Sequence, residues 1–347
     1  MKKYYTIPFF IPHRACPFKC IFCDQKKIIG SPANSAEIYD IALKIPETVE
    51  KYLSTMRHGT KTHIEIGFFG GTFTGLNEES QKILLTPAYQ FVQSKKIFGI
   101  RLSTRPDFID QNKLKLLKNF GITTIELGIQ SMSDSVLRAS KRGYTAKDAE
   151  NASKLIITEG FNLGHQIMLG LPESSFEDEY NTVMSAVKLK ALEVRIYPLI
   201  VIEGTEIALL WKEKKYLPLT MEEAVSRSTR LLDYLYSNNI KVIRCGLHPS
   251  ETLLKKENIL AGPFHPSFRQ KAESKLFGDM LKKISLNENI ISVHYNPNDE
   301  QSFYGFQKYN HDTINQIKKK NIQILKDRAI PVKRLGYKTQ SEIIITA

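Results

Sequence analysis

Residues 16–23 read CPFKCIFC, and this short stretch contains three of the four cysteines of the chain. A disulfide framework is typical of small secreted proteins that carry more cysteines than this one. Closely spaced thiols in any other setting indicate metal binding, because thiolates are soft ligands that suit zinc and iron–sulfur clusters. The fourth cysteine, Cys245, lies far away in the chain and is expected to be a small buried hydrophobe.

The spacing C-x3-C-x2-C of Cys16, Cys20 and Cys23 favours an iron–sulfur cluster. A loop this tight can bring three sulfurs to three iron corners of a cubane, and the fourth iron then stays open for the amino and carboxylate groups of a small molecule. The alternative is a structural zinc with His13 as the fourth ligand. Such zinc sites usually combine two ligand pairs, and no second C-x2-C or H-x3-H pair follows in the sequence.

Short apolar runs alternate with amphipathic segments through the first 200 residues. We expect strands at 7–12, 63–69, 98–104, 123–130, 162–169 and 192–202. We expect helices at 36–56, 78–92, 111–119, 146–159 and 176–188. This alternation predicts parallel strands joined by right-handed crossovers, and six such units suit an open partial barrel better than a closed one of eight units.

The pattern changes after residue 215. A long amphipathic helix is expected at 220–238, and an extra strand at 241–247. Further strands are expected at 291–295, 322–325 and 342–346, with a helix at 312–320. The predicted fold is therefore α/β, a partial (β/α)6 TIM-like barrel over residues 1–215 with a small α+β C-terminal extension over residues 216–347.

The formal net charge of +13 is unevenly distributed. Residues 1–30 carry +5 and residues 251–347 carry +6, whereas the residues between them carry only +2. A polyanion such as RNA that contacts both ends would suit this pattern, although a solvated basic surface would have the same composition. No apolar run approaches the ~20 residues of a membrane span, and no signal peptide is recognisable, so a cytoplasmic protein without membrane contact is expected.

In barrels of this kind, chemistry gathers where the strands end. The chain places unusual polar and glycine residues at those ends. They include Gly70, Gly71, Thr72, Ser103, Arg105 and Gln130, and the fourth strand carries Glu126.

These features resemble the radical S-adenosylmethionine (SAM) superfamily over residues 5–215, chiefly through CPFKCIFC. Within it, the chain is most similar to the radical domain of the Elongator catalytic subunit and its short bacterial relatives, through STRPDFID at 103–110, IELGIQSMSD at 125–134 and KRGYT at 141–145. A more distant similarity, through GLP at 170–172 and YPLIVIEGT at 197–205, is to oxygen-independent coproporphyrinogen oxidase.

The resemblance implies that Cys16, Cys20 and Cys23 bind a [4Fe-4S] cluster and that Phe22 packs near the adenine of SAM. It implies that a Gly-Gly-Thr segment at 70–72 receives the methionine amino group, with Thr72 where relatives carry an acidic residue. The remaining SAM-binding residues that it implies are Ser103, Arg105, Glu126, Gln130 and Arg142. The alternatives are that the glycines form only a tight turn and that Glu126 is half of a buried ion pair.

The implied reaction is reductive cleavage of SAM to a 5′-deoxyadenosyl radical, with one electron from an external donor of the flavodoxin or ferredoxin type. The implied substrate is tRNA. Because no glycine-rich acyl-CoA loop is recognisable in residues 216–347, we expect a short form without the acetyltransferase domain. The alternatives are a coproporphyrinogen-oxidase-like enzyme on a small molecule and a non-enzymatic protein that binds zinc and RNA. His248 and His265 are further candidates for substrate contact, and the oligomeric state does not follow from the sequence.

Overall fold

The computed structural model describes residues 3–11, 16, 20–24, 37–55, 62–247, 258–287, 289–339 and 342–346. It divides into two compact units. The first comprises residues 1–195, 199–218 and 249–262, and the second comprises residues 196–198, 219–248 and 263–347. Each unit is made of three separate ranges of the chain. The single domain boundary expected at residue 215 stays a prediction.

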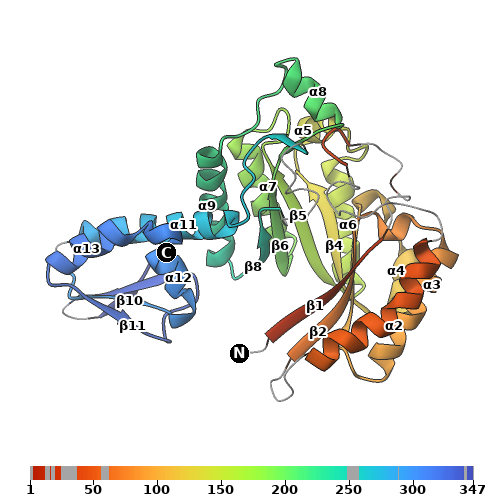
Figure 1. Ribbon diagram of the computed structural model, residues 1–347, viewed down its shortest axis with the longest axis horizontal. Helices are drawn as coiled ribbons and strands as arrows, with labels where there is room; N and C mark the ends of the chain where they lie inside the picture. Colours follow the sequence, from red (N-terminus) through yellow and green to blue (C-terminus); the bar gives the residue numbers. More distant parts are fainter. Residues whose placement is uncertain are drawn as a thin grey trace. The chain divides into compact units, whose positions relative to one another are not determined.

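A curled seven-stranded sheet forms the partial barrel, with strands in the order β1-β2-β3-β4-β5-β6-β8 (Figure 1). The strands are β1 (Lys3–Phe10), β2 (Thr62–Phe69), β3 (Gly99–Thr104), β4 (Ile122–Gln130), β5 (Asn162–Leu169), β6 (Glu193–Pro198) and β8 (Lys241–Cys245). Neighbours from β1 to β5 run parallel. The expected parallel partial barrel is confirmed, and the extra strand expected at 241–247 is its seventh strand.

The run at 192–202 was expected to form one strand, and that prediction is wrong. The chain leaves the sheet after Pro198, where Leu199 N donates to Leu169 O at 2.8 Å. It then forms the short strand β7 (Val201–Ile202), which pairs antiparallel with β9 (Ile259–Ala261). An apolar run can therefore continue through a bend, because both of its parts are buried.

In the described part of the first unit, seven α-helices connect or flank these strands. They are α2 (Glu37–Thr55), α3 (Glu78–Gln93), α4 (Gln111–Asn119), α5 (Asp134–Ala139), α6 (Ala146–Thr158), α7 (Phe176–Lys188) and α8 (Glu206–Lys212). The start of α7 is fixed by a capping box, in which Ser175 and Asp178 satisfy each other's backbone N–H groups. The end of α6 is followed by Gly160 at φ +86°, a left-handed conformation that suits glycine.

The two faces of the sheet differ in chemistry, because side chains alternate along each strand. On β5, Leu163 and His165 face the helices, and His165 Nε2 lies 2.9 Å from Ser153 Oγ on α6. We call this helix-covered side the outer face. Glu126 on β4 and Gln166 on β5 lie on the opposite side, which we call the inner face.

The second unit contains a second sheet, in the order β11-β10-β12-β13. Its strands are β10 (Ser292–Tyr295), β11 (Gln323–Lys326), β12 (Leu335–Lys338) and β13 (Ile343–Ile345). Its helices are α9 (Met221–Ser237), α11 (Phe268–Ser285), α12 (Glu300–Tyr304) and α13 (His311–Lys319). Buried Phe277, Leu281 and Val293 belong to its core.

Sequence reasoning missed α11 and β12. Buried residues of α11 include Glu273, Ser274 and Gly278 beside its apolar side chains, so the helix shows no clear division into an apolar and a polar face. No helix in the described part of the chain is both long enough and apolar enough to cross a bilayer.

Candidate functional site

The cysteine loop follows β1 and is anchored by its own apolar residues. Cys23 N donates to Cys20 O at 3.1 Å, which forms a turn. Ile21 and Phe22 are buried in an apolar cluster that also contains Val136. Ile21 O accepts a bond of 2.9 Å from Ile207 N, at the start of α8. This packing fixes the part of the loop that presents Cys20.

Side chains from other elements contact the sulfurs of Cys16 and Cys20. Thr72 Oγ1 lies 2.9 Å from Cys16 Sγ. Arg142 Nη1 donates to Cys20 Sγ at 3.0 Å, and Arg105 Nη1 lies 3.9 Å from the same sulfur. Residues that are far apart in sequence therefore converge on the cysteine loop.

Each nitrogen of the Arg142 guanidinium has an acceptor. Its Nε donates to Tyr144 Oη at 3.0 Å and its Nη2 to Gly128 O at 2.7 Å. Burial lowers the pKa of Arg142, but the attraction of Tyr144 and Cys20 outweighs this effect and holds its pKa above the usual value. The side chain therefore stays a cation in a fixed position.

The end of β2 makes a turn at Gly70, which is compatible both with the expected SAM-binding role of the two glycines and with the alternative of a simple tight turn. Gly70 has φ +99°, which suits a glycine, and Thr72 is 1% exposed. At the end of β4, Gln130 has φ +58° and is buried. Among the described residues, its Oε1 has no hydrogen-bond partner, and an unsatisfied buried acceptor of this kind suits a ligand that donates a hydrogen bond.

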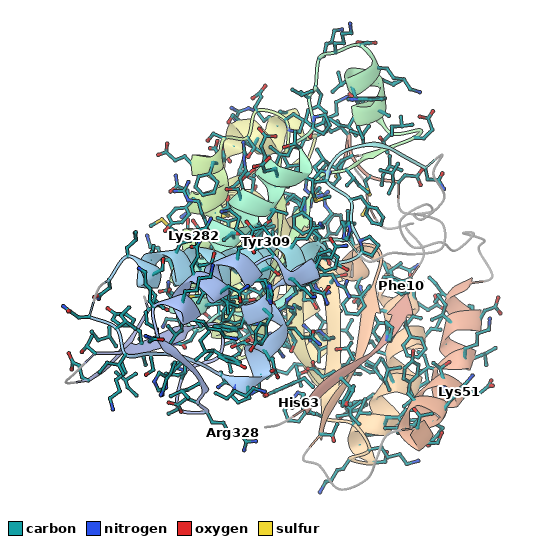
Figure 2. The ribbon with its side chains drawn as sticks, turned by 60° about the vertical axis from the view of Figure 1, so that its left-hand side comes forward. Phe10, Lys51, His63, Lys282, Tyr309 and Arg328 are labelled. Atoms are coloured by element: carbon teal, nitrogen blue, oxygen red, sulfur yellow. The ribbon has the colours of Figure 1, made fainter. Side chains whose placement is uncertain are left out.

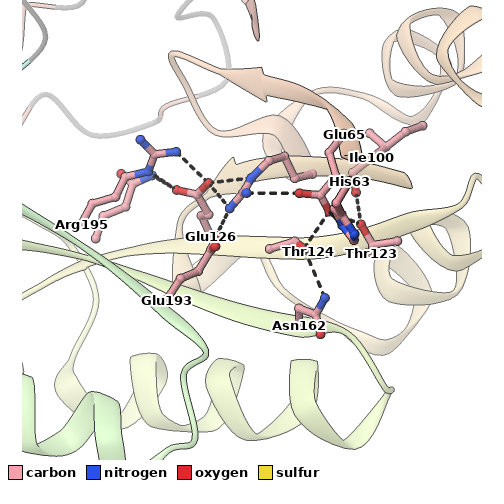
Figure 3. Close-up of polar contacts among 11 residues, drawn as sticks. His63, Glu65, Ile100, Thr123, Thr124, Glu126, Asn162, Glu193 and Arg195 are labelled. Carbon is pink, nitrogen blue, oxygen red and sulfur yellow. Dashed lines mark hydrogen bonds and ion pairs between the residues drawn. The ribbon is translucent and has the colours of Figure 1, made fainter. Parts of the chain in front are cut away.

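Five charged residues form a network on the inner face of the barrel (Figure 3). We call it the inner-face network, and its members are Glu65, Arg101, Glu126, Glu193 and Arg195. The residues come from β2, β3, β4 and β6. Their side chains are shielded from solvent, so the charges depend on one another for compensation.

Glu126 lies at the centre of this network. Arg101 Nε donates to its Oε1 at 3.0 Å, and Arg195 Nε donates to its Oε2 at 2.5 Å. Burial raises the pKa of Glu126, but the charges and hydrogen bonds of Arg195 and Arg101 lower it by a larger amount. The resulting pKa is about 2. A Cβ at Gly164 would lie 3.0 Å from Glu126 Cγ, so the glycine makes room for the carboxylate.

The residues of this region fit an iron–sulfur cluster with a bound nucleoside cofactor. Three thiols from one loop are a soft donor set, the sulfurs of Cys16 and Cys20 are hydrogen-bonded to side chains, and the buried Gln130 Oε1 has no donor among the described residues. No three His, Cys, Asp or Glu side chains in the described ranges are placed to hold one metal ion. In a cubane the cysteines bind separate irons. The zinc alternative includes His13, which lies outside the described residues.

The structure brings some of the expected site residues together. Arg142 and Arg105 meet at Cys20, and Arg105 Nη2 donates to Arg142 O at 2.5 Å. Ser103 lies beside Glu126 in the register of β3 and β4. Glu126 forms ion pairs with Arg101 and Arg195, so it has the buried ion pairing that was the alternative to SAM binding. The SAM-binding roles of these residues stay predictions.

Sequence reasoning missed Glu65, Arg101, Glu193 and Tyr144. A signal for the first three exists: each is a charged residue between two apolar neighbours in the sequence of a parallel strand, and such strands are normally apolar on both faces. Tyr144 belongs to the KRGYT motif, which by itself does not show that this side chain positions Arg142.

Two other candidates lie in the second unit. His265 Nδ1 accepts a bond of 2.9 Å from Ser267 N, just before α11, which is the arrangement of a turn residue. Burial raises the pKa of the Cys245 thiol to about 12, so Cys245 stays a neutral buried side chain, as expected. His248 lies outside the described residues.

Comparison with known proteins identifies the family. Residues 10–184 match the radical SAM superfamily, and residues 192–277 match the radical SAM C-terminal domain. The chain is 32% identical to a tRNA uridine(34) acetyltransferase of Methanocaldococcus jannaschii, over 60% of this chain and 45% of that protein. It is 28% identical to Elongator complex protein 3 of Homo sapiens, over 56% of this chain and 39% of that protein.

A similar solved structure is the archaeal Methanocaldococcus infernus Elp3 with an N-terminal deletion, at a TM-score of 0.61 and 20% identity. The similarity covers 82% of this chain and 64% of that one, and it supports the fold. The chain spans less than half of the length of the tRNA uridine(34) acetyltransferase and Elongator proteins named above.

Proposed function

The chain belongs to the radical SAM superfamily, and from this premise we propose that it is a radical SAM enzyme that modifies tRNA. The enzyme class follows from the family, whose members use a [4Fe-4S] cluster and SAM. The RNA substrate is supported by the names of the relatives and by a basic surface on the second unit.

The residues around the cysteine loop have distinct tasks in this proposal. Cys16, Cys20 and Cys23 hold the cluster, and Gln130 Oε1 accepts a hydrogen bond from the bound cofactor. When bound, the cluster and SAM supply a 5′-deoxyadenosyl radical that removes a hydrogen atom from the substrate. The packed Ile21 and Phe22 exclude water from one side of the loop.

The observation that carries the RNA part is a group of lysines in the second unit. We call it the lysine cluster, and its members are Lys282, Lys283, Lys318, Lys319 and Lys320. All five are exposed, and Figure 2 labels Lys282 on the surface of this unit. Lys320 Nζ donates to Ser285 O at 2.9 Å, so the ends of α11 and α13 are adjacent. Several lysines that gather at one place suit the phosphates of a nucleic acid.

The proposal includes a cytoplasmic location and an external one-electron donor of the flavodoxin or ferredoxin type. Both follow from the proposed reaction on tRNA, which needs an electron and a tRNA pool.

The enzyme part is tested with protein reconstituted anaerobically with iron and sulfide. We expect about four irons per chain, as in one cubane, and 5′-deoxyadenosine when SAM and a reductant are added. We expect the joint replacement of Cys16, Cys20 and Cys23 with alanine to abolish iron binding and 5′-deoxyadenosine formation. The matched control Cys245→Ala keeps the iron. Full SAM cleavage by the triple variant would contradict the proposal, and one zinc per chain without iron would support the zinc alternative.

The RNA part is tested by comparing the modified nucleosides of tRNA from strains with and without the gene. We expect one modified nucleoside to disappear in the deletion strain and to return with the wild-type gene, but not with the triple cysteine variant. Identical nucleoside profiles would remove tRNA as the substrate and leave the SAM chemistry intact.

A further inference from the structure

The sulfurs of Cys16 and Cys20 are hydrogen-bonded to side chains from distant parts of the first unit. Thr72 Oγ1 lies 2.9 Å from Cys16 Sγ, and Arg142 Nη1 lies 3.0 Å from Cys20 Sγ. Thr72 is 1% exposed and Arg142 is 6% exposed. The contact of Arg142 with Cys20 is therefore buried and that of Thr72 with Cys16 is partly buried, and low exposure to water strengthens their electrostatic effect.

The direction of each hydrogen bond follows from the chemistry of a bound cysteine. A cysteine that ligates iron is a thiolate and can only accept. The Thr72 hydroxyl must therefore donate to Cys16, and the guanidinium of Arg142 has only donors. Both groups place positive charge density against the cluster ligands.

The position of Arg142 is set by the protein and not by the cluster. Its Nε and Nη2 are occupied by Tyr144 Oη and Gly128 O, which leaves Nη1 aimed at Cys20. A donor that is already oriented needs little reorganisation when negative charge arrives.

We propose that Arg142 and Thr72 raise the reduction potential of the cluster, and that they are positioning residues for electron entry. The inference rests on the proposed cluster at Cys16, Cys20 and Cys23. One electron from the external flavodoxin- or ferredoxin-type donor adds one negative charge to the cluster, and no bond or proton is transferred in this step. Hydrogen bonds to the sulfurs and nearby positive charge favour the more negative state, which raises the potential.

The test is a redox titration of the reconstituted full chain, followed by the paramagnetic signal of the reduced cluster. SAM is left out, so that altered cofactor binding does not enter. For Thr72→Val and Arg142→Gln, we expect the ratio of reduced to oxidised cluster at a fixed potential to fall about tenfold, a shift of about 59 mV for one electron.

Conservative variants separate hydrogen bonding from packing. Thr72→Ser keeps the hydroxyl and retains the wild-type potential, and Arg142→Lys keeps the charge and shifts the potential less than Arg142→Gln. Arg138→Gln removes the same charge from an exposed position, where solvent screens it, and leaves the potential unchanged.

The outcomes are distinguishable. If the wild-type protein does not bind about four irons per chain, the proposed cluster itself is wrong. If wild type and variants load equally and Thr72→Val and Arg142→Gln titrate like wild type, the inference is wrong while the proposed function stands. If Arg142→Gln fails to take up iron, the comparison of Thr72→Val with Thr72→Ser decides, and an equal potential for these two overturns the proposal.

Discussion

At the scale of single residues, the inner-face network shows how a charged group can be stable inside the barrel. Glu126 is 1% exposed, and a buried carboxylate without partners would take up a proton. Two guanidinium groups prevent this by donating hydrogen bonds to both of its oxygens. Removal of one partner from such a pair leaves an uncompensated charge, which is why these residues depend on one another.

The network predicts a pH-dependent stability. Because the pKa of Glu126 falls from 4.5 to about 2 on folding, its contribution is present above pH 4.5 and is lost as the pH falls toward 2. Above pH 4.5, Glu126 contributes about 3 kcal/mol to the free energy of unfolding through this change in its pKa. We expect Glu126→Gln to lower the free energy of unfolding at pH 7 by about 3–5 kcal/mol. Because glutamine does not titrate, the free energy of unfolding of this variant should also depend less on pH below 4.5.

The measurement is urea unfolding at a series of pH values between 2 and 7. The matched control is Glu150→Gln, because Glu150 pairs with Lys147 and Lys154 on the exposed surface of α6, where ion pairs contribute little. Equal stability of Glu126→Gln and wild type across this range would show that the network does not stabilise the fold.

At the scale of elements, the boundaries of several helices are set by single hydrogen-bonding residues. The capping box of α9 joins Thr220 and Glu223, in which Thr220 Oγ1 accepts from Glu223 N and Glu223 Oε2 accepts from Thr220 N. The N-cap of α11 is Ser267, and its side chain makes no capping bond. Two helices of the same unit therefore begin in different ways.

This difference predicts unequal effects of alanine at the two N-caps. Thr220→Ala leaves an N–H of the first turn of α9 without its acceptor, and we expect it to lower the free energy of unfolding by about 1 kcal/mol. Ser267→Ala is the control, and we expect it to change the free energy of unfolding by no more than a few tenths of the effect of Thr220→Ala. The midpoint of urea unfolding measures both effects, and equal midpoints for the two variants would contradict the capping role.

At the scale of the whole molecule, the net positive charge is concentrated in residues 1–30 and 251–347 of the sequence. The lysines at the ends of α11 and α13 also stabilise those helices, because cations are favoured at helix C-termini. A role in RNA binding therefore makes a separate prediction, which concerns the dependence of affinity on salt.

We expect the joint replacement of Lys282, Lys283, Lys318 and Lys319 by alanine to weaken tRNA binding. The slope of log K against log salt should fall by about 1 for each phosphate that the variant no longer neutralises. Fluorescence anisotropy over a series of salt concentrations measures this slope. Lys147→Ala with Lys154→Ala is the control, since both lysines already pair with Glu150. An unchanged slope in the fourfold variant would exclude the lysine cluster as an RNA-binding surface.

The sequence by itself determined the features that depend on neighbouring residues. The spacing of the three cysteines, the alternation of strands and helices and the glycine after α6 are all written in short stretches of chain. Local patterning failed for α11, because its buried residues include small and polar side chains, and for residues 192–202, where one apolar run contains two strands.

Only the tertiary structure decided which polar groups meet. Arg142 and Cys20 are 122 residues apart, and Thr72 and Cys16 are 56 residues apart. The three glutamates around Arg101 come from three other strands. Residue types and spacing can suggest that such groups are buried, but their partners depend on which strands lie side by side and on the direction in which each side chain points.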